Sequence, residues 1–365
     1  MTTFKVKDLP FQTKAVEDII KAIDINPQAR VALIAPTGSG KTIICRRFIA
    51  SPYLHEVLLK NKTRKTVRII FKCHMGRLLT QARRRFDANI CGESTLEQWR
   101  NEDAGLPFTS PGTKVEICYQ MLGVKLEDND DIDLIVYDEY HHEACNTVQE
   151  FLSNAGKFPS LGMTASPERG DNCLIKFDVM VEPLTRQEAV SQGYICETDI
   201  NTIVDSSSQN KVHLLKKVLV AFNHEMKQTM IFVRTRKEIK EVVEFINSTI
   251  GEGLSQGCDE GDDLDFILDS FGNQEFKYIV SCKKLGEGVD ISGVTDVVFA
   301  KNIGSAIDLN QYIGRAARVD IPECRCWEFV NPFSTNLDTV DVVGIPKSHR
   351  LINLKGNEFV VRDFM

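Results

Sequence analysis

Short apolar runs alternate with amphipathic segments along the first half of the chain. Pro10 opens a helical pattern whose apolar face includes Phe11 and Ile19. Runs rich in apolar and β-branched residues then predict strands at residues 31–34, 66–71, 115–118 and 133–137, and one from residue 160 into a turn ending at 167. Because strand and helix patterns alternate, we expect a mostly parallel sheet flanked by crossover helices. In such sheets ligands bind beyond the carboxyl ends of the strands.

The alternation resumes in the second half of the chain. Helices are predicted at residues 212–226, 237–250 and 306–318, and strands at 229–233, 278–281, 296–300 and 326–330. Residues 251–263, rich in Gly and Asp, predict a loop. Weak periodicity over residues 181–208 predicts a linker, with the crossing point near Gly193. We therefore expect an α/β protein of two domains, residues 1–192 and 193–365, with no readable pattern from residue 331 onward.

The composition of the chain bears on the cellular compartment in which we expect the protein. Its 365 residues are 42% hydrophobic, enough for two cores of ordinary domain size. No apolar run approaches the ~20 residues that cross a bilayer, and the N-terminus lacks an apolar signal core. The eleven cysteines show no zinc-ligand spacing, so we expect reduced thiols. These features predict a cytoplasmic or nuclear protein with no membrane partner.

The charge is unevenly distributed along a chain whose net charge is −7. Residues 60–85 hold ten basic side chains and no acidic one, whereas acid collects at residues 127–133 and 259–265. Such a basic block is either a solvated helix face or an electrostatic footprint for phosphates.

The sequence APTGSGKT at residues 35–42 follows a buried strand and precedes a helix, which is the context of a phosphate-binding P-loop. Gly38 and Gly40 let the backbone N–H groups turn inward, next to the positive end of the helix dipole. Lys41 would reach the β- and γ-phosphates, and the Thr42 hydroxyl would bind Mg²⁺. The first position is Ala35, where this motif has Gly.

Two adjacent carboxylates, Asp138 and Glu139, end another predicted buried strand. Beside a P-loop, Asp138 would hold Mg²⁺ and Glu139 would orient and deprotonate the attacking water. The alternative is that Asp138 caps the next helix while Glu139 is solvated. His141 and His142 have no further ligands at metal-binding spacing, so we interpret His141 as a polar coupler to the second domain and His142 as a surface residue.

The predicted helix at residues 306–318 carries Arg315 and Arg318, which share one face because they are three residues apart. Two guanidinium groups on one face suit a phosphate approached from across a cleft, as arginine fingers do. The alternative is a surface helix held by salt bridges.

In their order and character these blocks resemble the motifs of superfamily 2 helicases of the DExH type, across nearly the whole chain. The similar segments are Phe11-Gln12 (Q motif), residues 35–42 (motif I), 71–81 (Ia), 138–141 (II), 164–166 (III), 231–235 (IV), 281–290 (V) and 311–318 (VI). The Gly-Val-Asp-Ile and Gly-Arg-Ala-Ala-Arg forms of motifs V and VI are most similar to phage branch-migration and restriction-motor helicases. Motif Ia departs from the family, with Cys73-His74 where Pro-Thr is usual.

The resemblance implies two RecA-like domains that bind ATP and Mg²⁺ and act on nucleic acid. By residue, it implies nucleotide binding by Gln12, Thr37, Gly38, Ser39, Gly40, Lys41, Thr42, Gly288 and Asp290; a metal held by Thr42 and Asp138; catalysis by Lys41, Glu139, Gln311, Arg315 and Arg318; coupling by His141, Thr164 and Ser166; and strand contacts by Lys72, Arg77, Arg234, Lys283 and Lys284.

The sequence thus predicts an ATP-driven helicase or translocase, most simply a monomeric motor, with DNA favoured over RNA and branched, forked or R-loop substrates favoured among DNAs. An RNA helicase or a transcript-release factor is the nearest alternative. A P-loop phosphotransferase would leave the paired arginines and the second α/β domain unexplained. A binding protein with an inactive ATP site is disfavoured by the intact Lys41, Asp138 and Glu139.

Overall fold

The computed structural model divides into two compact units, Met1–Pro36 with Gly40–Thr185 and Thr37–Ser39 with Arg186–Met365. The structure describes residues 9–86, 90–91, 113–122, 132–141, 158–166, 175–204, 210–259, 262–282, 285, 291, 293–302, 306–316, 323–330, 346–355 and 358–363. Within these ranges no helix is long and apolar enough to span a membrane. The chain passes between the units at Thr185, whereas the boundary expected from the sequence lies after residue 192.

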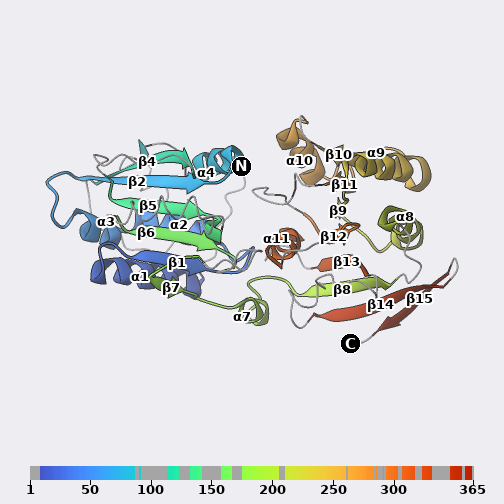
Figure 1. Ribbon diagram of the computed structural model, residues 1–365, viewed down its shortest axis with the longest axis horizontal. Helices are drawn as coiled ribbons and strands as arrows, with labels where there is room; N and C mark the ends of the chain where they lie inside the picture. The colour runs from blue at the N-terminus through green and yellow to red at the C-terminus, as the bar shows by residue number, and fades with distance from the viewer. Residues whose placement is uncertain are drawn as a thin grey trace. The chain divides into compact units, whose positions relative to one another are not determined.

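The first unit is built on a sheet to which the described residues contribute seven strands, in the order β3-β4-β2-β5-β6-β1-β7 (Figure 1). The strands are β1 (Arg30–Ile34), β2 (Thr66–Cys73), β3 (Ile90–Cys91), β4 (Lys114–Met121), β5 (Leu134–Asp138), β6 (Ser160–Thr164) and β7 (Val179–Val181). All pairings are parallel except β3 with β4. The carboxyl ends of β1, β5 and β6 therefore lie at one edge.

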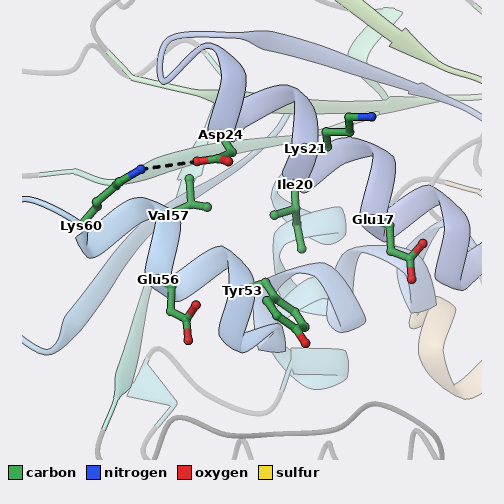
Figure 2. A pocket seen from close by; sticks show the side chains of 8 residues that line it. All are labelled: Glu17, Ile20, Lys21, Asp24, Tyr53, Glu56, Val57 and Lys60. Atoms are coloured by element: carbon green, nitrogen blue, oxygen red, sulfur yellow. Dashed lines mark ion pairs between the residues drawn. The ribbon is translucent and has the colours of Figure 1, made fainter.

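Four helices accompany this sheet in the described part of the unit: α1 (Pro10–Ile25), α2 (Lys41–Ala50), α3 (Pro52–Leu59) and α4 (Gly76–Phe86). Pro10 occupies the first turn of α1, and Phe11 and Ile19 are buried as the pattern predicted. The helices α1 and α3 border a cavity of ≈ 520 Å³ with an apolar floor of Ile20 and Val57 (Figure 2).

Part of the basic block is neutralised inside the first unit. The carboxylate of Asp133, immediately before β5, is fully buried and pairs with Lys62 and with Arg64, whose Nη1 lies 2.7 Å from Oδ2. The same Oδ2 accepts the backbone N–H of Arg68 at 2.7 Å, which ties β5 to β2. Arg68 itself pairs with Glu116. Residues 60–68 are therefore not one free electrostatic surface, because Asp133 and Glu116 offset their charge.

The second unit contains a sheet to which the described residues contribute eight strands, in the order β10-β11-β9-β12-β13-β8-β14-β15. The strands are β8 (Thr198–Val204), β9 (Thr229–Phe232), β10 (Ser255–Cys258), β11 (Tyr278–Ser281), β12 (Asp296–Phe299), β13 (Cys324–Val330), β14 (Ser348–Lys355) and β15 (Glu358–Asp363). They are parallel except for the β14–β15 pair.

Side chains that alternate along the strands of this second sheet build two cores. On β9, Met230 and Phe232 join one core, whereas Ile231 joins the other. The helices of the unit are α7 (Arg186–Ser191), α8 (Lys211–Phe222), α9 (Arg236–Phe245) with its π-helical end η2 (Ile246–Ile250), α10 (Leu264–Gly272) and α11 (Ala306–Ala316). The first core takes residues from α10 and α11 and the second from α8 and α9, so both faces of the sheet are covered. The predicted α/β class is confirmed for both units.

Two segments were assigned wrongly from the sequence. Residues 181–208, expected to be a linker, contain α7 and the strand β8 within the sheet. Polar side chains of β8 form hydrogen bonds to β14: the Ser348 hydroxyl donates to Asp199 at 2.6 Å, and Arg350 Nε donates to Oδ1 of Asn201 at 2.6 Å. Residues 251–263, expected to be a loop, contain the edge strand β10, where a Cβ on Gly257 would meet Ile239 at 2.7 Å.

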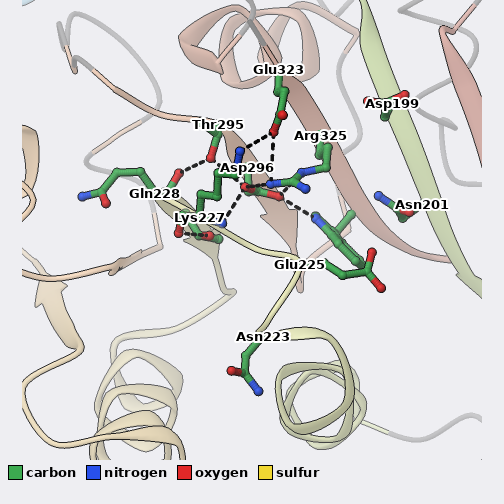
Figure 3. A network of polar contacts seen from close by, with 12 residues as sticks. Asp199, Asn201, Asn223, Glu225, Lys227, Gln228, Thr295, Asp296, Glu323 and Arg325 are labelled. Carbon is green, nitrogen blue, oxygen red and sulfur yellow. Dashed lines mark hydrogen bonds and ion pairs between the residues drawn. The ribbon is translucent and has the colours of Figure 1, made fainter. Parts of the chain in front are cut away.

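Asp296, the first residue of β12, is the centre of a buried polar network in the second unit (Figure 3). Arg325 binds its carboxylate through Nε at 2.9 Å and Nη2 at 3.0 Å, and the Trp327 indole N–H donates at 3.0 Å. The backbone N–H of Lys227 adds a further bond at 3.0 Å. One carboxylate thus connects β12 to β13 and to the residues that precede β9.

We expect Asp296→Ala to lower the free energy of unfolding of the second unit by about 3 kcal/mol, because the buried Arg325 and Trp327 donors would lose their acceptor. Glu323→Ala removes an exposed carboxylate that pairs with Lys227 in the same network, and should have a small effect. Urea unfolding of both variants measures the difference. Equal effects would show that Asp296 is not the anchor of the network.

Candidate nucleotide-binding site

The P-loop joins the end of β1 to the start of α2, and its conformation requires glycine. Gly38 and Gly40 have φ angles of 87° and 91°, in the left-handed region that favours glycine. A Cβ at Gly40 would also lie 2.6 Å from Nε2 of Gln12, a residue that is almost fully buried. Gln12, which the family resemblance places in the Q motif, and the P-loop are therefore in contact within the first unit.

Lys41 and Thr42 are the first two residues of α2, where the backbone N–H groups of the first turn have no intrahelical acceptor. The Lys41 ammonium donates to the carbonyl of Ala35 at 2.9 Å and contacts that of Pro36 at 3.5 Å. The loop therefore curls around this ammonium group. A cation, a helix N-terminus and glycine backbone together favour a bound phosphate chain.

The register of β6 brings the two acidic residues to the same sheet edge as the P-loop. On one side of β6, Ile34 of β1 pairs with Thr164, and on the other side Asp138 of β5 pairs with Met163. The next residue, Glu139, has a φ of 53°, a strained conformation for a residue with a side chain. Its N–H donates to the Asp138 carboxylate at 3.1 Å.

Tyr140, the residue after Glu139, holds the end of β5 in place. Tyr140 lies over Gly162 of β6 so closely that a Cβ on that glycine would meet the ring at 2.2 Å. The Tyr140 hydroxyl donates to the carbonyl of Lys176 at 2.7 Å. The chain is thus fastened immediately beyond the two carboxylates, which fixes the strained Glu139 backbone at the strand end.

A chain of hydrogen bonds connects the Asp-Glu segment with the end of β6. The Thr164 hydroxyl donates to the Ser166 carbonyl at 2.8 Å, so it accepts from Nδ1 of His141, 3.0 Å away. Oε2 of Glu139 lies 3.5 Å from the same imidazole nitrogen. The structure therefore brings together His141, Thr164 and Ser166. The contact between His141 and the second domain stays a prediction, whereas His142 lies outside the described residues.

Two buried thiols, those of Cys45 and Cys73, lie close to these carboxylates. Burial raises the pKa of the Cys45 and Cys73 thiols, and the nearby negative charge of Asp138 raises both further. Glu139 adds to the effect at Cys73. The two carboxylates thus act on buried groups at this edge of the sheet, and carboxylate oxygens are ligands that a divalent cation prefers.

In the second unit, α11 presents Gln311 as a buried side chain, 2% exposed. Within the described part of the chain, neither polar atom of its amide has a hydrogen-bond partner. A buried amide of this kind usually has a partner. The side chains of Arg77 and Arg315, and residues Lys283, Lys284, Gly288, Asp290 and Arg318, lie outside the described residues.

Lys301, which no motif predicted, connects several elements at the carboxyl edge of the second sheet. Its Nζ donates to the carbonyl of Cys282 at 3.0 Å and to the Tyr312 hydroxyl at 3.1 Å. It also lies 4.9 Å from the Tyr312 ring centroid and 5.5 Å from that of Phe232. It thus links α11 to the ends of β9 and β11. In the sequence its only signal is a lysine just after a strand.

Of the residues predicted to contact a nucleic-acid strand, Lys72 must be corrected, whereas Arg234 stays a prediction. Lys72 is 1% exposed within the central strand β2, so its ammonium cannot reach a polyanion outside the fold. The side chain of Arg234 is 77% exposed, although its guanidinium lies 3.5 Å from Glu238. The sequence pattern could not separate the two, because both basic residues lie within or next to apolar strands.

The residues present suit ATP and Mg²⁺. The contact of Gln12 with Gly40 leaves no room for a side chain in the loop, so the backbone there can approach a phosphate closely. The Thr42 hydroxyl and the Asp138 carboxylate are hard oxygen donors of the kind Mg²⁺ prefers. A group of three or more His, Cys, Asp or Glu side chains that could hold a metal does not occur among the described residues.

Fold and site together define a protein of two RecA-like domains with a P-loop in the first. Residues 5–169 match the family described as "Type III restriction enzyme, res subunit", and residues 210–320 match "Helicase conserved C-terminal domain". The chain belongs to superfamily 2 of the helicases.

Individual relatives are distant. A putative ATP-dependent helicase of Saccharomyces cerevisiae, IRC3, is 19% identical over 97% of this chain and 54% of its own length. The chain thus spans about half of that relative. The DNA-bound Type ISP restriction-modification enzyme LlaBIII matches 96% of this chain and 32% of its own, at 16% identity and a TM-score of 0.66. S. cerevisiae Dbp5 bound to RNA matches 94% of both chains, at 14% identity and a TM-score of 0.57.

We expect Lys41→Ala and Glu139→Gln to fail in different ways. Loss of the Lys41 ammonium removes charge-assisted bonds to phosphate, so the Kd for ATP should rise about tenfold or more. Glu139→Gln keeps the shape but removes the base, so ATP should bind normally while turnover falls about a hundredfold or more. Fluorescent-nucleotide titration and phosphate release measure the two effects. Near-normal turnover in Glu139→Gln would contradict the role assigned to Glu139.

Proposed function

We propose that this protein is an ATP-driven helicase or translocase that moves along or remodels DNA. The observation that carries the proposal is the convergence of the P-loop, Asp138-Glu139 and Thr164 at one edge of the first sheet, on either side of β6. A phosphate cradle and a paired carboxylate at one edge are the parts that hydrolysis of a phosphoanhydride needs.

Each residue has a distinct role in the proposed reaction. Lys41 binds the phosphates, while Thr42 and Asp138 hold Mg²⁺, which would neutralise the charge that develops on the phosphates. Glu139 orients the attacking water and takes its proton. The second domain would contribute Gly288, Asp290 and Gln311 to nucleotide binding, with Arg315 and Arg318 as arginine fingers, in line with the family resemblance.

The bonds among His141, Thr164 and Ser166 support a coupling role for motif III. Glu139 lies 3.5 Å from the imidazole nitrogen that donates to Thr164, so a change in the hydrogen bonding of Glu139 acts on the histidine that holds the threonine. The segment after β6 would then respond to the state of the nucleotide. In this way a change at the bound phosphates would alter the affinity of the protein for a nucleic-acid strand.

We propose that four basic residues contact the nucleic-acid strand: Arg77, Arg234, Lys283 and Lys284. A protein with a net charge of −7 binds a polyanion through a locally positive surface, and the exposed Arg234 side chain can contribute to one. Lys62 and Arg64 are excluded from this role because they are engaged by Asp133.

DNA is favoured as the track because the first domain matches a restriction-enzyme family and because LlaBIII was seen bound to DNA. Branched, forked or R-loop DNA is proposed from the likeness of motifs V and VI to branch-migration motors. An RNA helicase is the second candidate, since the fold is shared with RNA-bound Dbp5. A cytoplasmic or nuclear location accords with the sequence composition.

Hydrolysis of ATP should be faster with nucleic acid present, because the strand favours the closed arrangement of the two domains. The test is steady-state ATPase with single-stranded, forked, four-way and R-loop DNA, and with RNA of the same sequence; Glu139→Gln is the control. Stimulation by DNA above RNA supports the proposal, and the reverse order supports the RNA helicase. Hydrolysis that no oligonucleotide stimulates would favour a phosphotransferase instead.

A further inference from the structure

The strand β15 is the last strand of the second sheet, and it pairs with β14 on one side only in the described part of the chain. It lies at the margin of the sheet in Figure 1. Val360 and Val361 are 36% and 41% exposed there. An edge strand with exposed β-branched residues offers backbone N–H and C=O groups to another strand.

One face of β15 packs toward the core of the second unit, and the other carries charged side chains. Phe359 packs against Phe222 of α8, with ring centroids 5.3 Å apart, so this face of the strand is turned toward the second core. Glu358, Val360 and Arg362 alternate with it and form a row on the opposite face. This row has an acidic residue at one end, a basic residue at the other and valine midway between them.

We propose that β15 pairs antiparallel with β15 of a second copy of this chain, with Val360 on the two-fold axis. In this register Glu358 lies opposite Arg362 of the partner subunit, and Arg362 lies opposite Glu358 of the partner subunit. Val360 meets its own symmetry mate. The row is therefore self-complementary in charge, which an isologous interface requires.

Neighbouring registers lack this complementarity. Moving the axis to between Val360 and Val361 places Glu358 opposite Asp363 of the partner subunit, so that like charges face each other twice. With the axis on Val361, Arg362 lies opposite valine and has no charged partner. In-register parallel pairing would stack Glu358 on Glu358 and Arg362 on Arg362. Charge therefore selects one register.

The position of β15 makes such pairing compatible with the rest of the unit. The strands β13, β8 and β14 separate it from β9, β11 and β12, whose ends carry Lys301 and its partners. A dimer through β15 would replace the expectation of a monomeric motor and does not rest on the proposed function. In this register five residues of each β15, 358–362, pair with the partner subunit. This is a small interface, so we expect a dissociation constant on the order of micromolar.

Sedimentation equilibrium of the full chain between about 1 and 200 µM tests the proposal. The wild type should show a monomer–dimer equilibrium. Glu358→Arg alone and Arg362→Glu alone each convert both ion pairs into repulsions, so each should weaken the dimer about tenfold or more. The double exchange Glu358→Arg/Arg362→Glu should restore it, and an equimolar mixture of the two single variants should form a heterodimer.

Circular dichroism and thermal melting establish that all variants are folded, which is expected since both side chains are exposed. A wild type that remains monomeric throughout the range would overturn the proposal and show that the charges of β15 protect the edge from pairing. A dimer unaffected by the single variants would place the interface elsewhere, and likewise overturns it.

Discussion

The parallel pairing of β6 with both β1 and β5 is the constraint on which the proposed site depends. Because the register pairs Ile34 with Thr164 and Asp138 with Met163, three chain segments far apart in sequence end at one edge. The P-loop, the two carboxylates and the Thr164 hydroxyl follow directly from that register. A shift of one residue would turn each side chain of β6 to the opposite face and break the contact of Gly162 with Tyr140.

The opposite, amino-terminal edges of the two sheets are held by buried carboxylates. Asp133 precedes β5 and binds Lys62, Arg64 and the backbone of β2. Asp296 begins β12 and binds Arg325, Trp327 and Lys227. In each unit one acid thus fixes the start of a central strand, and in the first unit the P-loop and Glu139 lie at the opposite edge of the sheet. Strong anchoring at one edge permits strain, such as that of Glu139, at the other.

Local signals predicted most of the strands and the P-loop, because apolar runs and glycine conformations are properties of short segments. They failed for β8, whose Asp199 and Asn201 accept hydrogen bonds from Ser348 and Arg350, 149 residues further along the chain. They failed likewise for Lys72, since burial in β2 depends on the strands on both sides. Gln12 was singled out only through the family resemblance, and its contact with Gly40 was not predicted. Lys301 acts through contacts that no local pattern records.

We propose that the nucleotide bound at this sheet edge controls the affinity of the protein for a nucleic-acid strand. Glu139→Gln should bind ATP without consuming it, so its affinity for a fluorescent single-stranded oligonucleotide can be measured with ATP and with ADP at equilibrium. We expect the two Kd values to differ by about fivefold or more, the size of an ordinary coupling between sites. Equal affinities in the two nucleotide states would contradict it.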